Sequence, residues 1–257
     1  MKLNLVLAAA AVMAVSSQAI NSIAASAAPR YLTAALADAG RPAADKERDA
    51  DRKPAATLLF AGIKPNDRVV ELVPGGGYFT RLLSKAVGRG GKIYAVAPAP
   101  RADAPAGAPD RNAPLKAIAA DVNYPNVTVL VQPLKSLELP ARVDVVWTSQ
   151  NYHDVHNVPA IDLLAFNKAI FDALKPGGVY LVIDHVAASD AAADVTSKLH
   201  RINPEIVKQE VLAAGFVLEA QSDLLHNAND PHSATVIDPA VRGKTDQFMF
   251  KFRKPKT

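Results

Sequence analysis

The chain has 257 residues, of which 49% are hydrophobic and 21% are charged. This length and composition suit one large folded domain with a full hydrophobic core and exclude a disordered chain. The formal net charge is only +4 and the basic residues are scattered, which argues against a nucleic-acid partner. The chain contains no cysteine, so disulfides, zinc–thiolate sites and cysteine nucleophiles are excluded.

The N-terminus is typical of a secretory signal peptide. Lys2 precedes an apolar run at residues 3–15, which is short for a membrane span. Residues 25–27 read Ala-Ser-Ala, a candidate cleavage site, and residues 17–19 are a second candidate. We therefore expect residues 1–27 to be removed and the mature protein to be exported to the periplasm without a stable membrane anchor. The alternative is an uncleaved anchor or a buried helix.

Residues 28–47 are interpreted as an N-terminal extension of the folded domain. Alanines mixed with charges predict a solvated helix over residues 43–53. A second helix is expected to begin at Pro54, because proline is favoured in the first helical turn. Its apolar side chains are expected to face the core: Leu58, Leu59 and Phe60.

Strands and helices alternate in the rest of the chain. Strands are predicted at residues 68–73, 92–96, 126–132, 143–149, 179–183, 217–225 and 247–252. Helices are predicted at residues 79–87, 160–174 and 204–214. This alternation predicts an α/β fold with a mostly parallel sheet and helices on both faces. Only a loop joins the last two strands, so we expect them to be antiparallel neighbours.

In the segment VVELVPGGGYFT at residues 69–80, three consecutive glycines follow the end of the first of these strands. In an open parallel sheet, ligands bind beyond the carboxyl ends of the strands. Glycines allow bare backbone to approach such a ligand, and the next helix offers unpaired amides. The turn lacks the Lys-Ser/Thr of a phosphate-binding loop and the spacing of a dinucleotide site. The remaining alternative is a tight turn without a ligand.

This segment resembles the first motif of class I AdoMet-dependent methyltransferases, in which an acidic residue, a glycine turn and an aromatic residue follow one another. RVDVVWTSQNYHD and ALKPGGVYLVIDH are similar to the fourth-strand and fifth-strand segments of that superfamily. A closer resemblance, to a group of predicted exported methyltransferases, rests on RDADRKP, PGGGY, NYHD, LHRI, VLAAGF and RGKTDQF. The resemblance implies a Rossmann-like, seven-stranded, mostly parallel sheet with one antiparallel strand over residues 48–257.

The resemblance also implies S-adenosyl-L-methionine (AdoMet) as the cofactor. The cofactor-binding residues that it implies are Glu71, Gly75, Gly76, Gly77 and Tyr78. Gln132 is added as a candidate: it stands where the family usually has an acidic residue after the third strand, and its amide could still meet an adenine edge. Ala97 departs from the family pattern, because it stands where an acidic residue usually holds the ribose. Loss of such a charged hydrogen bond costs about 1.5–3 kcal/mol. Asp103 or Asp110 could compensate from the Pro/Ala-rich surface loop at residues 98–114.

Candidate catalytic and substrate-binding residues follow the fourth and fifth strands. His153 is a candidate general base with Asp154 as its orienter, because an imidazole with a pKa near neutrality suits proton removal from a hydroxyl or amine. Alternatively, His153 only shapes the pocket, or Asp154 caps a helix. The candidate substrate-binding residues are Asn151, Tyr152, His185, His200 and Arg201.

Two further clusters have competing interpretations. The nitrogen and oxygen ligands of a metal could come from His153, Asp154, Asp184, His185 and His200. No compact spacing such as H-E-x-x-H supports a metal, so we predict hydrogen-bonded histidines and no metal site. Arg48, Asp51 and Arg52 are within one helical turn and form either a solvated charged face or a lid that binds a carboxylate.

The function predicted from the sequence is an exported methyltransferase that moves a methyl group from AdoMet to a small-molecule nucleophile. The alternative is a non-catalytic periplasmic module that binds a nucleoside-like ligand on the same fold. Export and Ala97 favour this alternative, since AdoMet is made in the cytosol. A metal-dependent hydrolase and an NAD oxidoreductase have less support.

Overall fold

The computed structural model describes residues 28–99, 105, 107–134, 137–159 and 161–256. The expected signal peptide at residues 1–27 lies outside the described residues, and so does Asp103 of the expected surface loop. Within the described ranges, no helix is both long enough and apolar enough to cross a membrane.

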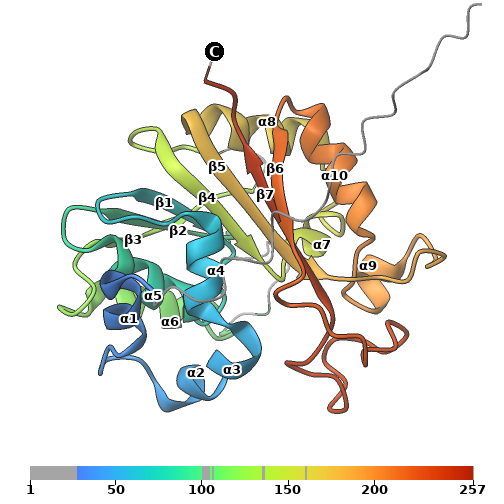
Figure 1. Cartoon of the computed structure of the whole chain (residues 1–257), viewed down its shortest axis with the longest axis horizontal. Helices are drawn as coiled ribbons and strands as arrows, with labels where there is room; N and C mark the ends of the chain where they lie inside the picture. The colour runs from blue at the N-terminus through green and yellow to red at the C-terminus, as the bar shows by residue number, and fades with distance from the viewer. Residues whose placement is uncertain (1–27, 100–104, 106, 135–136, 160, 257) are drawn as a thin grey trace, which may run out of the picture.

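The described residues form one seven-stranded sheet with the order β3-β2-β1-β4-β5-β7-β6 (Figure 1). The strands are β1 (Arg68–Leu72), β2 (Lys92–Ala97), β3 (Val127–Val131), β4 (Val143–Ser149), β5 (Leu174–His185), β6 (Val217–Ser222) and β7 (Gln247–Arg253). The first five strands are parallel, and β7 is antiparallel to both β5 and β6. The predicted Rossmann-like sheet with one antiparallel strand is therefore confirmed.

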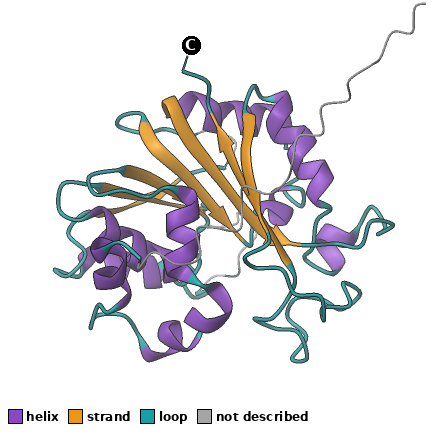
Figure 2. Cartoon of the chain, viewed as in Figure 1, coloured by secondary structure: helices purple, strands orange, loops and turns teal. Residues whose placement is uncertain are grey.

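Helices cover both faces of the sheet (Figure 2). One face packs against α1 (Arg30–Leu36), α4 (Pro54–Ala61), α5 (Tyr78–Val87) and α6 (Ala113–Ala120). The other face packs against α7 (Tyr152–Val155), α8 (Leu163–Ala173) and α10 (Pro204–Ala213). Each face of the sheet has its own hydrophobic core, which we call the first and the second core in this order. Successive residues of a strand point to opposite faces, so Trp147 packs in the first core and its neighbour Val146 in the second.

Three short helices complete the fold. The helix expected over residues 43–53 is divided into α2 (Ala43–Glu47) and α3 (Asp49–Arg52), and it ends at Lys53, which has a left-handed backbone with φ of 44°. The third is α9 (Val195–Lys198). In Figure 1, α2 and α3 lie beyond the ends of the central strands.

Several details differ from the sequence predictions. The helices α1 and α6 were not predicted, and α1 buries Leu32 and Ala35 in the first core, so residues 28–47 pack onto the domain. Leu59, expected in the core, is 38% exposed, whereas its neighbour Leu58 is buried. Successive helical residues point about 100° apart, so three in a row cannot face one side.

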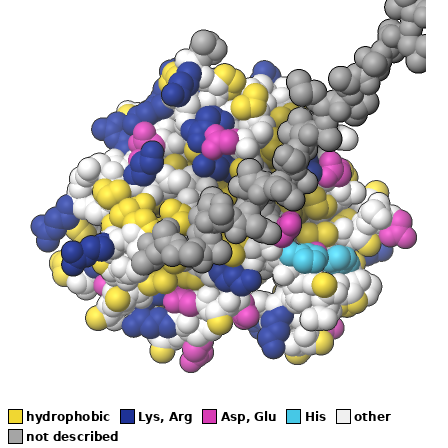
Figure 3. Space-filling model, in the orientation of Figure 1, with side chains coloured by type: hydrophobic (Ala, Val, Ile, Leu, Met, Phe, Trp, Pro, Cys, Tyr) yellow, Lys and Arg dark blue, Asp and Glu magenta, His cyan; other side chains and the backbone are white. Residues whose placement is uncertain are grey.

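Basic side chains are spread over the face shown in Figure 3, with acidic side chains between them. This face shows no single-sign stripe among the described residues. The distribution agrees with the small net charge of +4.

Candidate functional site

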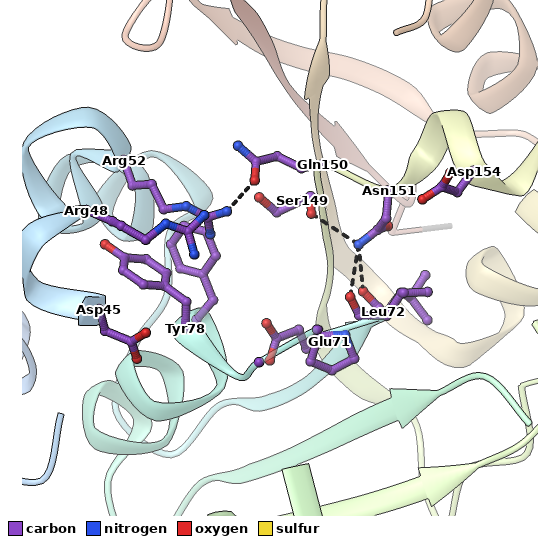
Figure 4. A pocket seen from close by; sticks show the side chains of 15 residues that line it. Asp45, Arg48, Arg52, Glu71, Leu72, Tyr78, Ser149, Gln150, Asn151 and Asp154 are labelled. Atoms are coloured by element: carbon purple, nitrogen blue, oxygen red, sulfur yellow. Dashed lines mark hydrogen bonds between the residues drawn. The ribbon is translucent and has the colours of Figure 1, made fainter. Parts of the chain in front are cut away.

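A cavity of about 310 Å³ lies at the carboxyl ends of β1 and β4 (Figure 4). Three parts of the chain line it: the segment from Glu71 to Gly76, the segment from Ser149 to Asn151 with Asp154, and helices α2, α3 and α5. The cavity therefore occupies the place where open parallel sheets bind ligands.

The three glycines of the turn have different surroundings. Gly75 and Gly76 line the cavity, and a Cβ atom at either position would meet no other atom within 4 Å. A Cβ atom at Gly77 would instead collide with Cδ1 of Ile118 on α6. Two of the glycines thus leave space at the cavity, whereas Gly77 allows α5 to pack closely against α6.

Two residues at the cavity have strained backbones. Val73 and Gln150, which follow β1 and β4, have positive φ values of 48° and 62°. Such conformations cost on the order of 1–3 kcal/mol for residues other than glycine. Backbone hydrogen bonds hold both residues in place, from Val73 N–H to Val96 O at 2.9 Å and from Gln150 N–H to Ile183 O at 2.8 Å. Strain of this kind collects at functional sites.

Glu71 places a buried carboxyl group beside the glycine turn. Its Oε2 accepts a hydrogen bond from Oγ1 of Thr80 at 2.6 Å. Burial raises the pKa of Glu71 to about 8, against the opposing effects of Thr80 and of the charge on Arg52. The carboxyl group is therefore largely protonated at neutral pH in the protein alone, and a cation bound beside it would favour its ionised form.

Two arginines of the RDADRKP segment face the cavity. The guanidinium groups of Arg52 and Arg48 lie 4.6 Å and 5.5 Å from the ring centroid of Tyr78. Arg52 also donates a hydrogen bond to Gln150 (Figure 4). Burial lowers the pKa of Arg52 to about 10, and the neighbouring charge of Arg48 adds to this effect, but the side chain stays charged at neutral pH. This position fits the interpretation of the segment as a lid, whereas Asp51 is exposed.

Asp49 fixes this segment to the domain. It accepts a hydrogen bond from the hydroxyl group of Tyr78 at 2.6 Å and pairs with the buried Arg41. The hydrogen bond joins α3 directly to α5, so the segment that carries Arg48 and Arg52 has a defined position at the cavity.

His153 is held by Asp184, not by its neighbour Asp154. Its Nδ1 lies 2.8 Å from Oδ1 of Asp184, and its backbone N–H donates to Oδ2 of Asp184 at 2.7 Å. Asp154 is 3.4 Å from Nε2. Burial would lower the pKa of His153, but the two carboxylates outweigh it and raise the pKa to about 10. His153 is therefore protonated at neutral pH, unlike the general base expected from the sequence.

The other two histidines named by the sequence flank His153. His185 is buried, its Nδ1 is 2.7 Å from Oγ1 of Thr245, and burial lowers its pKa to about 4. His200 is partly exposed, and its Nδ1 is 3.4 Å from Oδ1 of Asp154. The ring centroids of His185 and His200 lie 5.9 Å and 5.4 Å from that of His153. His200 thus joins His153 and Asp154 in one cluster.

Three residues that were predicted to bind substrate use their side chains in hydrogen bonds within the protein. Asn151 lines the cavity, but its amide N–H₂ donates to three backbone carbonyls that end β1 and β4. Tyr152 is fully buried and donates a hydrogen bond to Glu210 at 2.9 Å. Arg201 is also fully buried and forms a bidentate pair with Asp230, at 2.7 Å and 2.9 Å. Tyr152 and Arg201 are not among the residues that line the cavity.

The residues proposed for the ribose and adenine are not among those that line the cavity. Gln132 follows β3, and its Nε2 is buried without a hydrogen-bond partner among the described residues. Ala97 is fully buried in the apolar core beneath α5 and α6. Asp110 is paired with Lys116 at 2.7 Å. A carboxylate placed at residue 97 would enter this apolar core, so we do not expect that substitution to restore a ribose contact.

Sequence reasoning missed Gln150 and the orienting role of Asp184. Both lie at the carboxyl end of a strand, which was the available signal. The positive φ of Gln150 and the direction of the Asp184 carboxylate depend on neighbouring strands, and sequence patterns do not show either.

No family model and no curated protein sequence matches this chain. Solved structures do match its fold over most of its length. A SAM-dependent methyltransferase from Aquifex aeolicus is 19% identical with a TM-score of 0.58, over 82% of this chain and 94% of the other. Fibrillarin from Aeropyrum pernix, in complex with natively bound S-adenosyl-L-methionine, is 20% identical with a TM-score of 0.50, over 80% and 76%.

A third similar structure is the [4+2]-cyclase SpnF. It is 18% identical with a TM-score of 0.56, over 86% of this chain and 85% of the other. The chain therefore has the fold of class I SAM-dependent methyltransferases. The cyclase shows that this fold alone does not define a reaction.

Proposed function

We propose that the protein is an AdoMet-dependent methyltransferase that acts on a small-molecule nucleophile. The observation that carries this proposal is the pair of glycines, Gly75 and Gly76, open to a cavity beside the buried carboxyl group of Glu71. The fold, which the chain shares with SAM-dependent methyltransferases, supports the same conclusion.

The residues at the cavity fit AdoMet. Glu71 would hold the amino group of the methionine part. The methionine part would lie against the bare backbone of Gly75 and Gly76. Arg48 and Arg52 would hold its carboxylate, since guanidinium groups bind carboxylates with two hydrogen bonds. When bound, the cofactor supplies an electrophilic methyl group. Nε2 of Gln132, which has no hydrogen-bond partner among the described residues, would donate to an adenine edge.

Residues of the chain cover the cavity and offer a hydrogen-bond acceptor to the substrate. Arg52 and Tyr78 cover one side of the cavity and limit the entry of water. Asp154 lines the cavity with half of its side chain exposed. Burial would raise the pKa of Asp154, but His153 and His200 hold it below the ordinary value. Its ionised carboxylate can therefore accept a hydrogen bond from the O–H or N–H of the methyl acceptor.

Calorimetry with AdoMet and with its demethylated product tests ligand binding. Transfer of a labelled methyl group to a panel of small alcohols, phenols and amines tests the reaction. Binding without transfer to any acceptor would favour the alternative, a non-catalytic binding module, which Ala97 supports. Absence of binding by both ligands would contradict the methyltransferase proposal.

Export to the periplasm is part of the proposal and rests on the signal-like residues 1–27. We expect the mature chain to begin near Ala28. Mass spectrometry of the protein from periplasmic and cytosolic fractions measures this start. A stable cellular form that retains residues 1–27 would contradict it.

Glu71 should make the protein less stable as the pH rises. Its pKa is about 8 in the folded protein, above the value in the unfolded chain. The protonated carboxyl group therefore contributes fully to the free energy of unfolding at pH 4, and this contribution is lost as the pH rises to 8. The Glu71→Gln variant has an uncharged side chain at every pH, so its free energy of unfolding should not fall in this way. Relative to the variant, the wild type should lose a few kcal/mol of unfolding free energy between pH 5 and pH 8.5, on the order of magnitude that such a pKa shift implies.

Urea denaturation of both proteins at several pH values measures this difference. Glu138→Gln is the control, because that carboxyl group is exposed. A constant difference between wild type and Glu71→Gln over this pH range would show that Glu71 is ionised throughout.

A further inference from the structure

His153 and His200 flank Asp154, the one member of this cluster that lines the cavity. His153 and Asp154 belong to α7, and His200 lies just before the β-bridge between Val186 and Ile202. Each of the three side chains offers one ligand atom, and these atoms all lie within 4.8 Å of one another. The fold therefore brings together two imidazoles and a carboxylate that the sequence separates by more than forty positions.

The spacing of these atoms suits a shared ion better than hydrogen bonds. Nε2 of His153 and Nδ1 of His200 are each 3.4 Å from Oδ1 of Asp154. Charge-assisted hydrogen bonds are shorter, about 2.7–2.9 Å. Two ligands of a tetrahedral metal with bonds of about 2.0–2.1 Å lie about 3.3–3.4 Å apart. Both contacts match that tetrahedral edge.

Asp184 orients His153 as the outer carboxylate of a metal site does. It holds Nδ1 of His153 at 2.8 Å, so Nε2 is the nitrogen that faces Asp154. Asp184 is fully buried and also accepts the backbone N–H groups of His153 and His185. Metal-binding histidines usually donate their other ring nitrogen to such a carboxylate.

His200 is held in position from the adjacent residue. Its φ is 55°, in the left-handed region that residues other than glycine seldom adopt. The next residue, Arg201, is fixed by its buried pair with Asp230, and Ile202 N–H donates to His185 O at 3.0 Å. These contacts hold the imidazole of His200 beside Asp154 before any ligand binds.

We propose that His153, Asp154 and His200 bind one divalent transition-metal ion beside the cavity, which Asp154 lines. Imidazole and carboxylate ligands suit zinc and the neighbouring first-row divalent metals. The ion would replace the proton on Nε2 of His153. Since the side chains of Asp154 and His200 are 52% and 39% exposed, the remaining coordination positions face solvent and the cavity.

Such an ion would bind an oxygen or nitrogen atom of a small molecule in the cavity. With the proposed methyltransferase function, this molecule is the methyl acceptor, and the ion would lower the pKa of its hydroxyl group. This role rests on the proposed function. Metal binding itself does not, because no AdoMet is needed for it.

The chain offers a control in a second His–Asp–His set. His226 and His232 are 2.9 Å from separate oxygens of Asp246. These are ordinary hydrogen-bond lengths, with one oxygen for each imidazole.

The test is a titration of the metal-free protein with Co²⁺, followed by visible absorption, without AdoMet. We expect one equivalent to bind with ligand-field bands, and Zn²⁺ to displace it. His200→Ala and Asp154→Asn should each weaken binding at least about 100-fold, since loss of an outer carboxylate alone weakens metal binding 10–100-fold. His232→Ala should leave the affinity within a factor of two.

Circular dichroism shows whether each variant is folded, and we expect both His200→Ala and Asp154→Asn to fold because these side chains are partly exposed. No binding by the wild type at millimolar Co²⁺ would overturn the proposal. Equal loss of affinity in His232→Ala, or wild-type affinity in both His200→Ala and Asp154→Asn, would overturn it too. AdoMet binding, measured separately on metal-free protein, would not be affected by these outcomes.

Discussion

Replacing Asp230 with alanine is expected to lower the free energy of unfolding by about 3–5 kcal/mol. The change leaves the guanidinium group of Arg201 buried without its partner, and uncompensated buried charges have this cost. Asp230 also accepts the backbone N–H of Asp246 at 2.6 Å, which would be lost as well. For a domain of this size the melting temperature should fall by roughly 6–20 °C. Urea denaturation and thermal melts measure both quantities.

A partly exposed ion pair provides the control. Glu219 pairs with Arg253 on neighbouring strands, and both side chains are 32% exposed. Glu219→Ala should cost no more than about 1 kcal/mol. If Asp230→Ala were as stable as Glu219→Ala, the buried pair would not stabilise the fold, and Arg201 would again be a candidate for ligand binding.

Replacing Gly76 with valine should abolish AdoMet binding and leave the fold intact. Gly76 lines the cavity, its φ is outside the left-handed region, and a Cβ atom there meets nothing within 4 Å. The new side chain would therefore occupy the space proposed for the ligand. At a hundred times its Kd, AdoMet should stabilise the wild type by about 2.7 kcal/mol, which raises the melting temperature by roughly 5–10 °C. Gly76→Val should show no such rise.

Gly77→Val is the matched comparison, with the opposite expected result. Its φ is 82° and its Cβ would collide with Ile118, so the cost should appear in the fold, at about 2–5 kcal/mol. The molecules that remain folded should still bind AdoMet. Wild-type AdoMet binding by a folded Gly76→Val variant would contradict the position proposed for the ligand.

The alternation of strands and helices was readable from the sequence because each element has its own apolar period. The strand at residues 143–149 was predicted with the bounds that the structure gives to β4. The antiparallel pairing of β6 and β7 followed from the missing helix between them. The helix α1 was not predicted, because only Leu32 and Ala35 of its seven residues are buried and two apolar positions are too few to show a helical period.

The location of the site was also readable, because ligands of a parallel sheet bind where its strands end. This rule pointed to Glu71, Gly75 and Gly76, which line the cavity. It pointed as well to Tyr152, which follows β4 but turns into the second core. Which way a side chain points after a strand ends depends on the packing of the next helix, and the sequence does not show this.

The sequence indicated all seven strands, several of the longer helices, the class of the sheet and the edge that carries the cavity, since these depend on local periodicity and chain topology. How individual side chains are used became visible only in the folded chain. The tertiary structure separated Gly77 from the other two glycines, paired Arg201 with Asp230, and brought His200 to His153. Contacts between residues far apart in the chain set these roles, because burial and charge partners exist only after the elements have packed together.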